Sequence, residues 1–241
     1  MIDIVVPVYN EGDHVRPLLN HIRDQIKSPK QIKIVYDMDS DNTIPAVREI
    51  EKQYDFNIEL VRNKFGRGAL NAIITGMQAA ENECVLVIMA DLSDSLEVVD
   101  AMYGKMNSEG FDIVCGSRYM KGGKQFGGPF WKGLCSRMAG ISLHLLTRIP
   151  THDISNSFRM YRKSMLDQIH IESDGGFEVA MEITVKAFLQ GYRVTEIPSS
   201  WFDRDTGESR FQLRKWIPKY LHWYCYCIRR TWTGKRIQAV R

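Results

Sequence analysis

The sequence predicts an α/β domain in which a mostly parallel, Rossmann-like sheet is flanked by helices. Short β-branched runs alternate with helical patterns, and the helical patterns repeat apolar residues every three or four positions. Polar residues directly follow several of the β-branched runs, as they do where a parallel sheet binds a ligand. The chain of 241 residues is long enough for one large domain of this class.

The elements follow in order along the chain. Strands are expected at five runs in the first half: Ile2–Val6, Ile32–Tyr36, Ile58–Val61, Val85–Met89 and Ile113–Cys115. Helices are expected between and after them, at Val15–Ile26, Ala46–Gln53, Ala69–Ala80, Val98–Met106, Leu134–Leu146 and Phe177–Gln190. A loop rich in Gly, Lys and aromatic residues is expected from Tyr119 to Gly133, and a last strand at Val194–Ile197.

The segment Trp216–Trp232 has an unusual composition, with three Trp, three Tyr and several Lys and Arg residues. Such a helix is typical of a membrane interface, where aromatic rings and basic side chains meet the lipid headgroups. A terminal helix packed on the core would explain the pattern equally well. We therefore divide the chain into a domain over 1–213 and an aromatic, basic helical segment over 214–241 that could contact a membrane.

Composition and charge exclude several classes of protein. The net charge of +3 is too small to indicate nucleic-acid binding without a concentrated basic patch. Five cysteines without a C-x-x-C pair or zinc spacing favour reduced thiols and hence the cytoplasm. The N-terminus has no signal-peptide pattern, and no apolar run reaches the roughly 20 residues that span a bilayer. We therefore expect a cytoplasmic protein that is neither secreted nor integral to the membrane.

Polar loops follow three of the predicted strands: Pro7–Glu11, Asp37–Thr43 and Ala90–Asp94. The carboxyl ends of parallel strands share one edge of the sheet, so these loops should lie close together. One Asp after one strand usually marks a turn. Acidic clusters after two strands of the same sheet indicate a shared purpose, such as binding a divalent cation.

Several motifs, in order, resemble family 2 glycosyltransferases of the GT-A fold. The opening Val5-Val6-Pro7-Val8-Tyr9-Asn10-Glu11 is followed by Gly66-Arg67-Gly68-Ala69, Ala90-Asp91-Leu92-Ser93 and Gly116-Ser117-Arg118-Tyr119 with Gly122-Gly123. The last of these is similar to the dolichol-phosphate mannose synthase branch. So are the segments 153–161, reading DISNSFRMY, and 203–210, reading DRDTGESR. Each motif alone is weak, but the ordered set covers about residues 2–213.

The resemblance implies a nucleotide-sugar donor and a divalent metal. The positions that match the family's donor-binding motifs are Pro7, Tyr9, Glu11, Asp37, Gly68 and Asp91, and those that match its metal-binding region are Asp91, Ser93 and Asp94. Hard carboxylate oxygens suit Mg²⁺ or Mn²⁺, which retain water and phosphate oxygens as further ligands. The sequence departs from the family at Met89, which replaces the first Asp of the D-x-D motif, and at Tyr36, which replaces the first Asp of a D-D-G-S motif.

The resemblance also implies an acceptor phosphate. The expected phosphate-binding residues are Arg118, Lys132, Ser136, Arg204 and Arg210; Arg159 is a further basic candidate, and Lys132 stands where the branch has Arg. Guanidinium groups bind phosphate through two hydrogen bonds. The expected catalytic residues are Asp91, Arg118 and Arg204.

The function that follows is an inverting transfer of a sugar from a GDP- or UDP-sugar to a polyprenyl phosphate, either dolichyl or undecaprenyl phosphate. The reaction is expected at the cytoplasmic face of the membrane, as part of cell-envelope biosynthesis. The protein is expected to attach peripherally, and a membrane-anchoring subunit is a possible partner. A dianionic phosphate needs no strong general base. Two alternatives stay open: a family 2 transferase acting on a sugar hydroxyl in wall, capsule or lipopolysaccharide synthesis, with Glu178 or Glu182 as base, and a non-catalytic subunit that binds nucleotide sugar.

Overall fold

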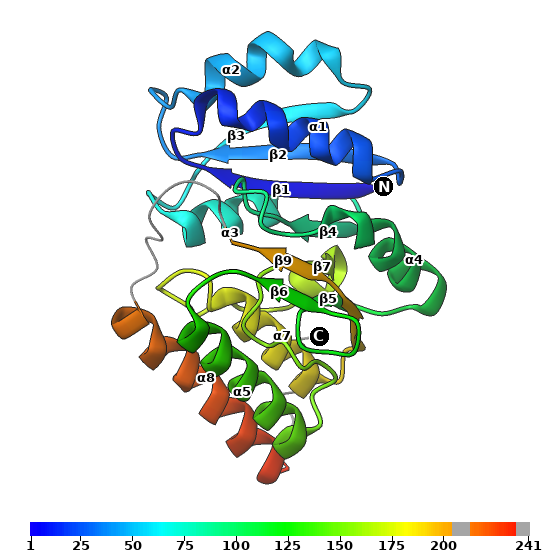
Figure 1. Ribbon diagram of the computed structural model, residues 1–241, viewed down its shortest axis with the longest axis vertical. Helices are drawn as coiled ribbons and strands as arrows, with labels where there is room; N and C mark the ends of the chain where they lie inside the picture. The colour runs from blue at the N-terminus through cyan, green and yellow to red at the C-terminus, as the bar shows by residue number, and fades with distance from the viewer. Residues whose placement is uncertain (204–212, 235–241) are drawn as a thin grey trace.

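The computed structural model describes residues 1–203 and 213–234, and its centre is a seven-stranded sheet (Figure 1). The strand order is β3-β2-β1-β4-β7-β5-β8. The bounds are Ile2–Val8 for β1, Lys30–Tyr36 for β2, Asn57–Arg62 for β3, Cys84–Val87 for β4, Ile113–Ser117 for β5, Arg159–Arg162 for β7 and Val194–Pro198 for β8. The sheet is mostly parallel, and only β7 runs antiparallel to its two neighbours.

The central strands are buried on both faces, which explains their nearly continuous apolar sequences. In β1, Ile4 and Val6 point to one face and Val5 to the other, and all three are fully buried. β1 pairs with β2 from Ile2↔Lys30 to Val8↔Tyr36, so the two strands end together. This shared end brings the loops that follow β1 and β2 to one edge of the sheet.

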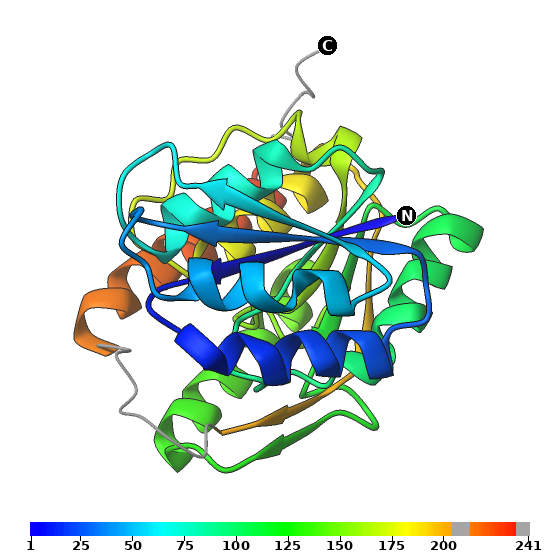
Figure 2. The same ribbon diagram turned by 90° about the horizontal axis from the view of Figure 1, so that it is seen from above.

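Helices cover both faces of the sheet, as Figure 2 shows for α1 and α2 on one side and α3 and α7 on the other. One face is covered by α1 (Val15–Gln25), α2 (Thr43–Ile50) and α4 (Val99–Glu109). The opposite face is covered by α3 (Ala69–Ala79), α6 (Lys163–Leu166) and α7 (Val179–Gln190). Short 3₁₀ turns complete the connections at η1 (Gly12–His14), η2 (Glu51–Gln53) and η3 (Leu96–Val98).

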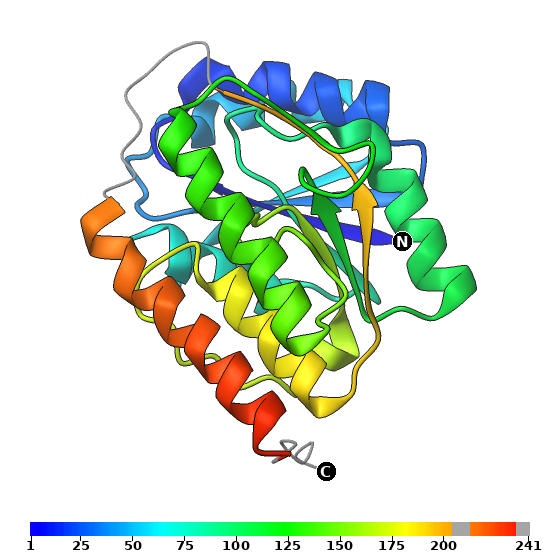
Figure 3. The same cartoon turned by 60° about the horizontal axis from the view of Figure 1, so that its bottom comes forward.

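A separate helical layer is formed by α5 (Phe130–Thr147) and α8 (Leu213–Trp232), which lie beside α7 (Figure 3). Trp223 and Cys227 of α8 are buried against Leu143 of α5 and Val185 of α7. Helix α8 therefore packs on the core along one side. Within the described residues, no helix is long and apolar enough to cross a bilayer.

A two-stranded parallel ribbon, β6 (Lys124–Phe126) and β9 (Ser200–Phe202), lies outside the main sheet. Strand β9 also runs beside the segment after β4, where Phe202 N donates to Ser93 O and Ser95 N donates to Ser200 O. The ribbon thus braces the loop that carries Asp91.

The predicted fold class is confirmed, with differences in single elements. β4 ends at Val87 rather than Met89, and α5 begins at Phe130 inside the segment 119–133 that was expected to be a loop. Strands β6, β7 and β9 were not predicted. β7 is short and bounded by Arg159 and Arg162, so it lacks the continuous apolar run by which the other central strands were recognised.

Candidate active site

The loops that follow β1 and β2 are joined by hydrogen bonds at the carboxyl edge of the sheet. Asp41 is fully buried, and its carboxylate accepts hydrogen bonds from Asn10 N at 3.0 Å and Thr43 N at 2.8 Å. The Thr43 hydroxyl accepts a further bond from Glu11 N at 3.0 Å. Of the predicted donor-binding residues, Pro7 lies within β1, while Tyr9 and Glu11 lie in the loop that these bonds fix.

Asp37 follows β2 and holds the glycine-rich turn before α3. Its Oδ1 accepts a hydrogen bond from Asn63 Nδ2 at 2.7 Å, and its Oδ2 accepts one from Gly68 N at 2.9 Å. Gly68 has a φ of 121°, which only glycine adopts without strain. The structure therefore brings together the predicted donor-binding residues Asp37 and Gly68, and it adds Asn63 to them.

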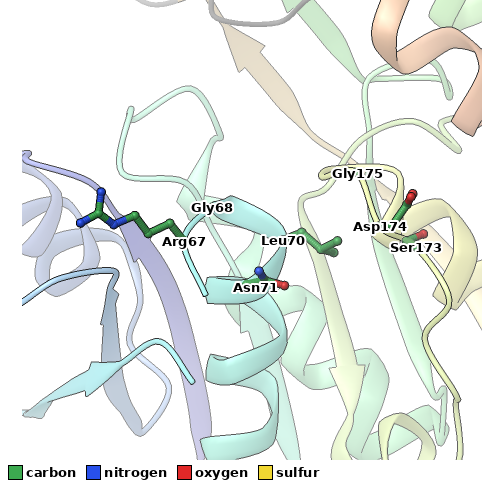
Figure 4. A pocket seen from close by; sticks show the side chains of 7 residues that line it. All are labelled: Arg67, Gly68, Leu70, Asn71, Ser173, Asp174 and Gly175. Carbon is green, nitrogen blue, oxygen red and sulfur yellow. The ribbon is translucent and has the colours of Figure 1, made fainter. Parts of the chain in front are cut away.

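A cavity of about 350 Å³ opens beside this turn (Figure 4). One wall is the start of α3 and the residues before it, and the other is the loop before α7. The lining residues are Arg67, Gly68, Leu70, Asn71, Ser173, Asp174 and Gly175. In Figure 4 Leu70 points from α3 toward the opposite wall, whereas the guanidinium of Arg67 points away from it. The cavity thus combines one apolar side chain with amide, hydroxyl and carboxylate groups.

The loop after β4 contains the predicted metal ligands Asp91, Ser93 and Asp94. Asp91 Oδ1 accepts a hydrogen bond from Ser93 N at 3.1 Å, and Leu92 between them has a φ of 57°. Ser93 Oγ and Asp94 Oδ1 are buried without a hydrogen-bond partner in the part of the chain that the structure describes. Buried polar atoms are nearly always satisfied, so two orphaned oxygens beside Asp91 fit a bound cation.

The electrostatic environment of Asp94 supports the same fit. Burial, with the charges of Asp91 and Asp153 nearby, raises the pKa of the Asp94 carboxyl to about 7, although the Arg118 guanidinium acts in the opposite direction. A cation would relieve this repulsion. Among the described residues no three His, Cys, Asp or Glu side chains gather as a metal site. Water and phosphate oxygens would therefore supply the remaining ligands of Mg²⁺ or Mn²⁺.

Met89, which replaces the first Asp of the D-x-D motif, is half-buried and packs against the core on the side of α3 and α7. A thioether is a poor ligand for Mg²⁺. The side chain at this position thus contributes to packing at the end of β4.

Arg118 lies directly after β5 and is held by Asp153. Arg118 Nε and Nη2 donate to Asp153 Oδ2 and Oδ1 at 2.7 and 2.8 Å, and the carboxylate also accepts from Arg118 N. Arg118 Nη2 further reaches Ser136 Oγ and Ser155 Oγ, both at 3.2 Å. Burial alone would lower the pKa of Arg118, but the Asp153 carboxylate more than offsets this and raises it.

Helix α5 brings Ser136 into this cluster. Gly140 makes the close approach possible, because a Cβ there would lie 2.0 Å from the carbonyl oxygen of His152. Tyr119 completes the group by donating its hydroxyl to Ser136 Oγ at 2.9 Å. Lys132 lies one helical turn before Ser136, so the structure brings Arg118, Ser136 and the Lys132 backbone to one region. Arg204 and Arg210 lie outside the described residues.

Two interpretations of the sequence are corrected by burial. Arg159 is not available to a phosphate, because it is fully buried and donates to the carbonyl oxygens of Asp153, Ile154 and Ala180. Glu178 and Glu182, the candidate bases for a sugar-hydroxyl acceptor, are both buried. Glu178 accepts bonds from Gly175 N and Gly176 N, and Glu182 accepts bonds from Glu172 N, Ser173 N and Lys186.

Five members of the site were not assigned roles from the sequence: Asp153, Ser155, Asp41, Asn63 and Tyr119. Asp153 and Ser155 belong to the segment 153–161, which was noted only as a family-like motif. Asp41 belongs to the acidic run after β2, where its short spacing to Thr43 is typical of a side chain that bonds its own loop. The sequence thus showed that these segments matter, but it did not show which side chains they contact.

A comparison with family models matches residues 3–170 to glycosyl transferase family 2. Among curated proteins, the chain is 29% identical over 244 residues to a dolichol-phosphate mannosyltransferase of Pyrococcus furiosus, and the match covers all of this chain and 66% of that protein. It is 24% identical over 228 residues to a polyprenol monophosphomannose synthase of Mycolicibacterium smegmatis, covering 91% of this chain and 85% of that one. The chain thus spans just under two thirds of the length of the archaeal relative.

Among solved structures, the chain superposes on glucosyl-3-phosphoglycerate synthase from Mycobacterium tuberculosis, in complex with phosphoglyceric acid. The TM-score is 0.69 and the sequence identity 13%. The superposition covers 95% of this chain and 80% of that one. A second structure of that enzyme holds Mn²⁺, UDP and phosphoglyceric acid, with a TM-score of 0.65. The fold is therefore that of the GT-A glycosyltransferases.

Proposed function

The chain belongs to glycosyl transferase family 2, and on this premise we propose that it is an inverting transferase with a polyprenyl phosphate as acceptor. A phosphate oxygen of dolichyl or undecaprenyl phosphate attacks the anomeric carbon of a nucleotide sugar. The bond from that carbon to the diphosphate breaks, and GDP or UDP leaves. The names of the two curated relatives support this acceptor class.

The observation that carries the choice of acceptor is the state of Glu178 and Glu182. A sugar hydroxyl requires a general base to remove its proton, and these glutamates were the candidates. Both are buried, and every carboxylate oxygen already accepts a backbone N–H. A phosphate monoester, with a second pKa of about 6, is already largely dianionic at neutral pH and needs no base.

The proposed acceptor-phosphate site is the cluster around Arg118. Ser136 and Ser155 present hydroxyls to Arg118 Nη2, and no hydrogen bond within the described residues involves Arg118 Nη1. The Asp153 carboxylate fixes the plane of the guanidinium, so that a phosphate would meet an oriented donor. Lys132, Arg204 and Arg210 are proposed to add positive charge from α5 and from the segment after β9.

The proposed donor site lies at the carboxyl ends of β1, β2 and β4. Tyr9, Glu11, Asp37 and Gly68 would surround the nucleoside. Asp91, Ser93 and Asp94 would hold Mg²⁺ or Mn²⁺, which stabilises the negative charge of the departing diphosphate when it is bound. The structural neighbour that binds Mn²⁺ and UDP supports this arrangement.

Peripheral attachment at the cytoplasmic face of the membrane is proposed from apolar surfaces beside the acceptor cluster. Phe130 and Trp131 at the start of α5 are 74% and 72% exposed, and Ile217, Leu221 and Trp232 of α8 are also exposed. Phe126 of β6 and Phe202 of β9 stack with ring centroids 4.9 Å apart and remain half exposed. Exposed aromatic residues with flanking Arg and Lys are typical of membrane-interface elements. A lipid acceptor would reach Ser136 along α5.

The acceptor is tested with two lipids of the same chain length, an undecaprenyl phosphate and undecaprenol. Each is incubated in vesicles with the chain, Mn²⁺ and radiolabelled GDP-mannose, UDP-glucose or UDP-N-acetylglucosamine. The phosphate is expected to yield labelled lipid and the alcohol none. Label on the alcohol, or on neither lipid with any donor, would contradict the proposal.

A further inference from the structure

The cavity between α3 and the loop before α7 has the size and lining of a small polar subsite. Its volume of about 350 Å³ lies at the lower end of the range of roughly 300–1,000 Å³ for ligand pockets. Asn71, Ser173 and Asp174 offer amide, hydroxyl and carboxylate groups, and Leu70 adds an apolar surface. This combination suits a sugar ring, which presents hydroxyls at its edge and C–H groups on its faces. Gly68 joins the cavity to Asp37 at the proposed donor site.

The wall formed by residues 172–176 is held firmly on its inner side. Glu182 accepts bonds from Glu172 N and Ser173 N, and Glu178 accepts bonds from Gly175 N and Gly176 N. Lys186 Nζ bonds both Glu182 and Glu172. Glu178, directly before α7, and Glu182 within it therefore fix the backbone of this wall.

The outer side of the same wall is held by three residues of α8. Lys219 Nζ lies 2.7 Å from Asp174 Oδ1, and Trp223 Nε1 donates to Ser173 Oγ at 3.2 Å. The Trp216 ring lies directly against Gly176, where an added Cβ would come within 2.5 Å of the ring. Two side chains that line the cavity are thus oriented by α8.

We propose that α8 positions the Ser173–Gly175 wall of the cavity for the sugar part of the donor, with Trp216 and Lys219 as the positioning residues. The inference rests on the proposed function and assigns the sugar subsite within it. Because the outward side of α8 carries the exposed Ile217 and Leu221, the helix that faces the proposed lipid surface also shapes the donor cavity. Contact with the lipid surface and the shape of the cavity are thereby linked through the same helix.

The first test compares binding of GDP with GDP-mannose, and of UDP with UDP-glucose, by calorimetry with Mn²⁺ present. In Lys219→Met the binding of whichever nucleotide sugar the wild type prefers should weaken about three- to fivefold, the upper range for a partly exposed ion pair. The matching nucleotide, which lacks the sugar, should bind as in the wild type. Lys219→Arg should restore sugar binding, because it retains the charge opposite Asp174.

The matched control is Lys105→Met, which removes another partly exposed lysine from an ion pair, with Glu109 on α4. It should leave all affinities unchanged. If the wild type binds nucleotides but no nucleotide sugar, the proposed function and the inference both fail. If the wild type binds nucleotide sugar and Lys219→Met binds it equally well, the inference alone is overturned.

The second test uses the contact between Gly176 and Trp216. Gly176→Ala keeps the N–H that Glu178 accepts but forces the Trp216 ring or the wall to move. It should weaken nucleotide-sugar binding more than nucleotide binding, because the displaced Trp216 ring no longer holds the wall in place. Equal weakening of nucleotide and nucleotide sugar in the folded variant, or unchanged binding of both, would contradict the positioning role.

Discussion

The side chains of Arg118 and Asp153 form a two-point ion pair that joins the end of β5 to the loop before β7. Nε and Nη2 of Arg118 lie 2.7 and 2.8 Å from the two oxygens of Asp153, which is fully buried. Both strands lie side by side in the sheet, so the pair links neighbouring elements separated by 35 residues in sequence. The guanidinium of Arg118 is thus held in one orientation by Asp153.

Replacing Arg118 should separate its structural contribution from its proposed role in phosphate binding. Arg118→Met leaves a buried carboxylate without its partner, which costs about 3–5 kcal/mol, or roughly 6–20 °C in melting temperature for a chain of this size. Arg118→Lys keeps the charge and should recover much of this stability. Transfer should remain severely reduced, because an ammonium cannot bond Asp153 at two points and reach the phosphate. Thermal melting measures the stability of each variant, and a turnover assay measures its transfer activity. Near-native turnover in Arg118→Lys would contradict the proposed role of Arg118 in phosphate binding.

Asp91→Asn should abolish transfer and leave the fold intact, because it removes the charge of the proposed metal ligand at nearly constant volume. Ser93 N can still donate to the remaining side-chain oxygen, so the loop keeps its hydrogen bond. Turnover is measured at saturating Mg²⁺ and Mn²⁺, and circular dichroism verifies folding. Activity close to that of the wild type would show that Asp91 is not the ligand.

The raised pKa of Asp94 predicts a pH dependence of stability and of metal binding. Its pKa in the folded chain is about 7, above the ordinary value of 3.8, so the native state retains a proton that the unfolded state releases. The metal-free protein should therefore lose stability as the pH rises from about 4 through about 7. Mn²⁺ requires the ionised carboxylate, so Mn²⁺ affinity should increase over the upper part of this range.

Asp94→Asn isolates this effect, because the amide has no proton to lose. In chemical denaturation without metal, the fall in stability near pH 7 should be smaller than in the wild type. In calorimetry, Mn²⁺ affinity should be weaker and nearly independent of pH. An unchanged pH profile in the variant would assign the titration to another group.

The two sides of the α5 and α8 layer should respond differently to substitution. Phe130→Ser with Trp131→Ser should abolish co-sedimentation with anionic liposomes without lowering the melting temperature, because both rings are exposed. Trp223→Ala should instead destabilise the chain by about 3–5 kcal/mol, because this ring is buried. Phe65→Ser removes an exposed aromatic elsewhere and serves as the control. Liposome binding that survives the double substitution would contradict membrane attachment through α5.

Much of the sheet was predictable because local sequence and tertiary environment agree. β1, β2 and β4 are largely buried and read as mostly apolar runs, interrupted only by Asp3 in β1 and by Lys30, Gln31 and Lys33 in β2, and α1 keeps its apolar residues on one side. β7 was missed because Arg159 gives the strand a polar start, yet the Nη1 and Nη2 groups of that buried side chain donate to the carbonyl oxygens of Ala180 and Ile154. The partners of this buried guanidinium include residues distant in sequence, so a local sequence pattern cannot predict them.

The candidate site was predictable to a similar extent. Asp37 and Asp91 could be placed because residues after parallel strands share one edge of the sheet. The partners of Arg118 could not be predicted. Asp153 lies close to Arg118 only because β5 and β7 pair in the sheet, and the sequence does not reveal this pairing. The interpretation of Glu178 and Glu182 as candidate bases failed for the same reason, since their partners are backbone N–H groups of a loop whose path the sequence does not reveal.

The most direct measurement of the central claim is the structure of the lipid product formed by the full chain from undecaprenyl phosphate and its preferred nucleotide sugar. Mass spectrometry gives the composition, and ³¹P and ¹H nuclear magnetic resonance give the linkage and the anomeric configuration. The expected product is a phosphodiester joining the anomeric carbon to the lipid phosphate, with the configuration inverted relative to the donor. A sugar attached through any hydroxyl oxygen, or a product that retains the donor configuration, would contradict it.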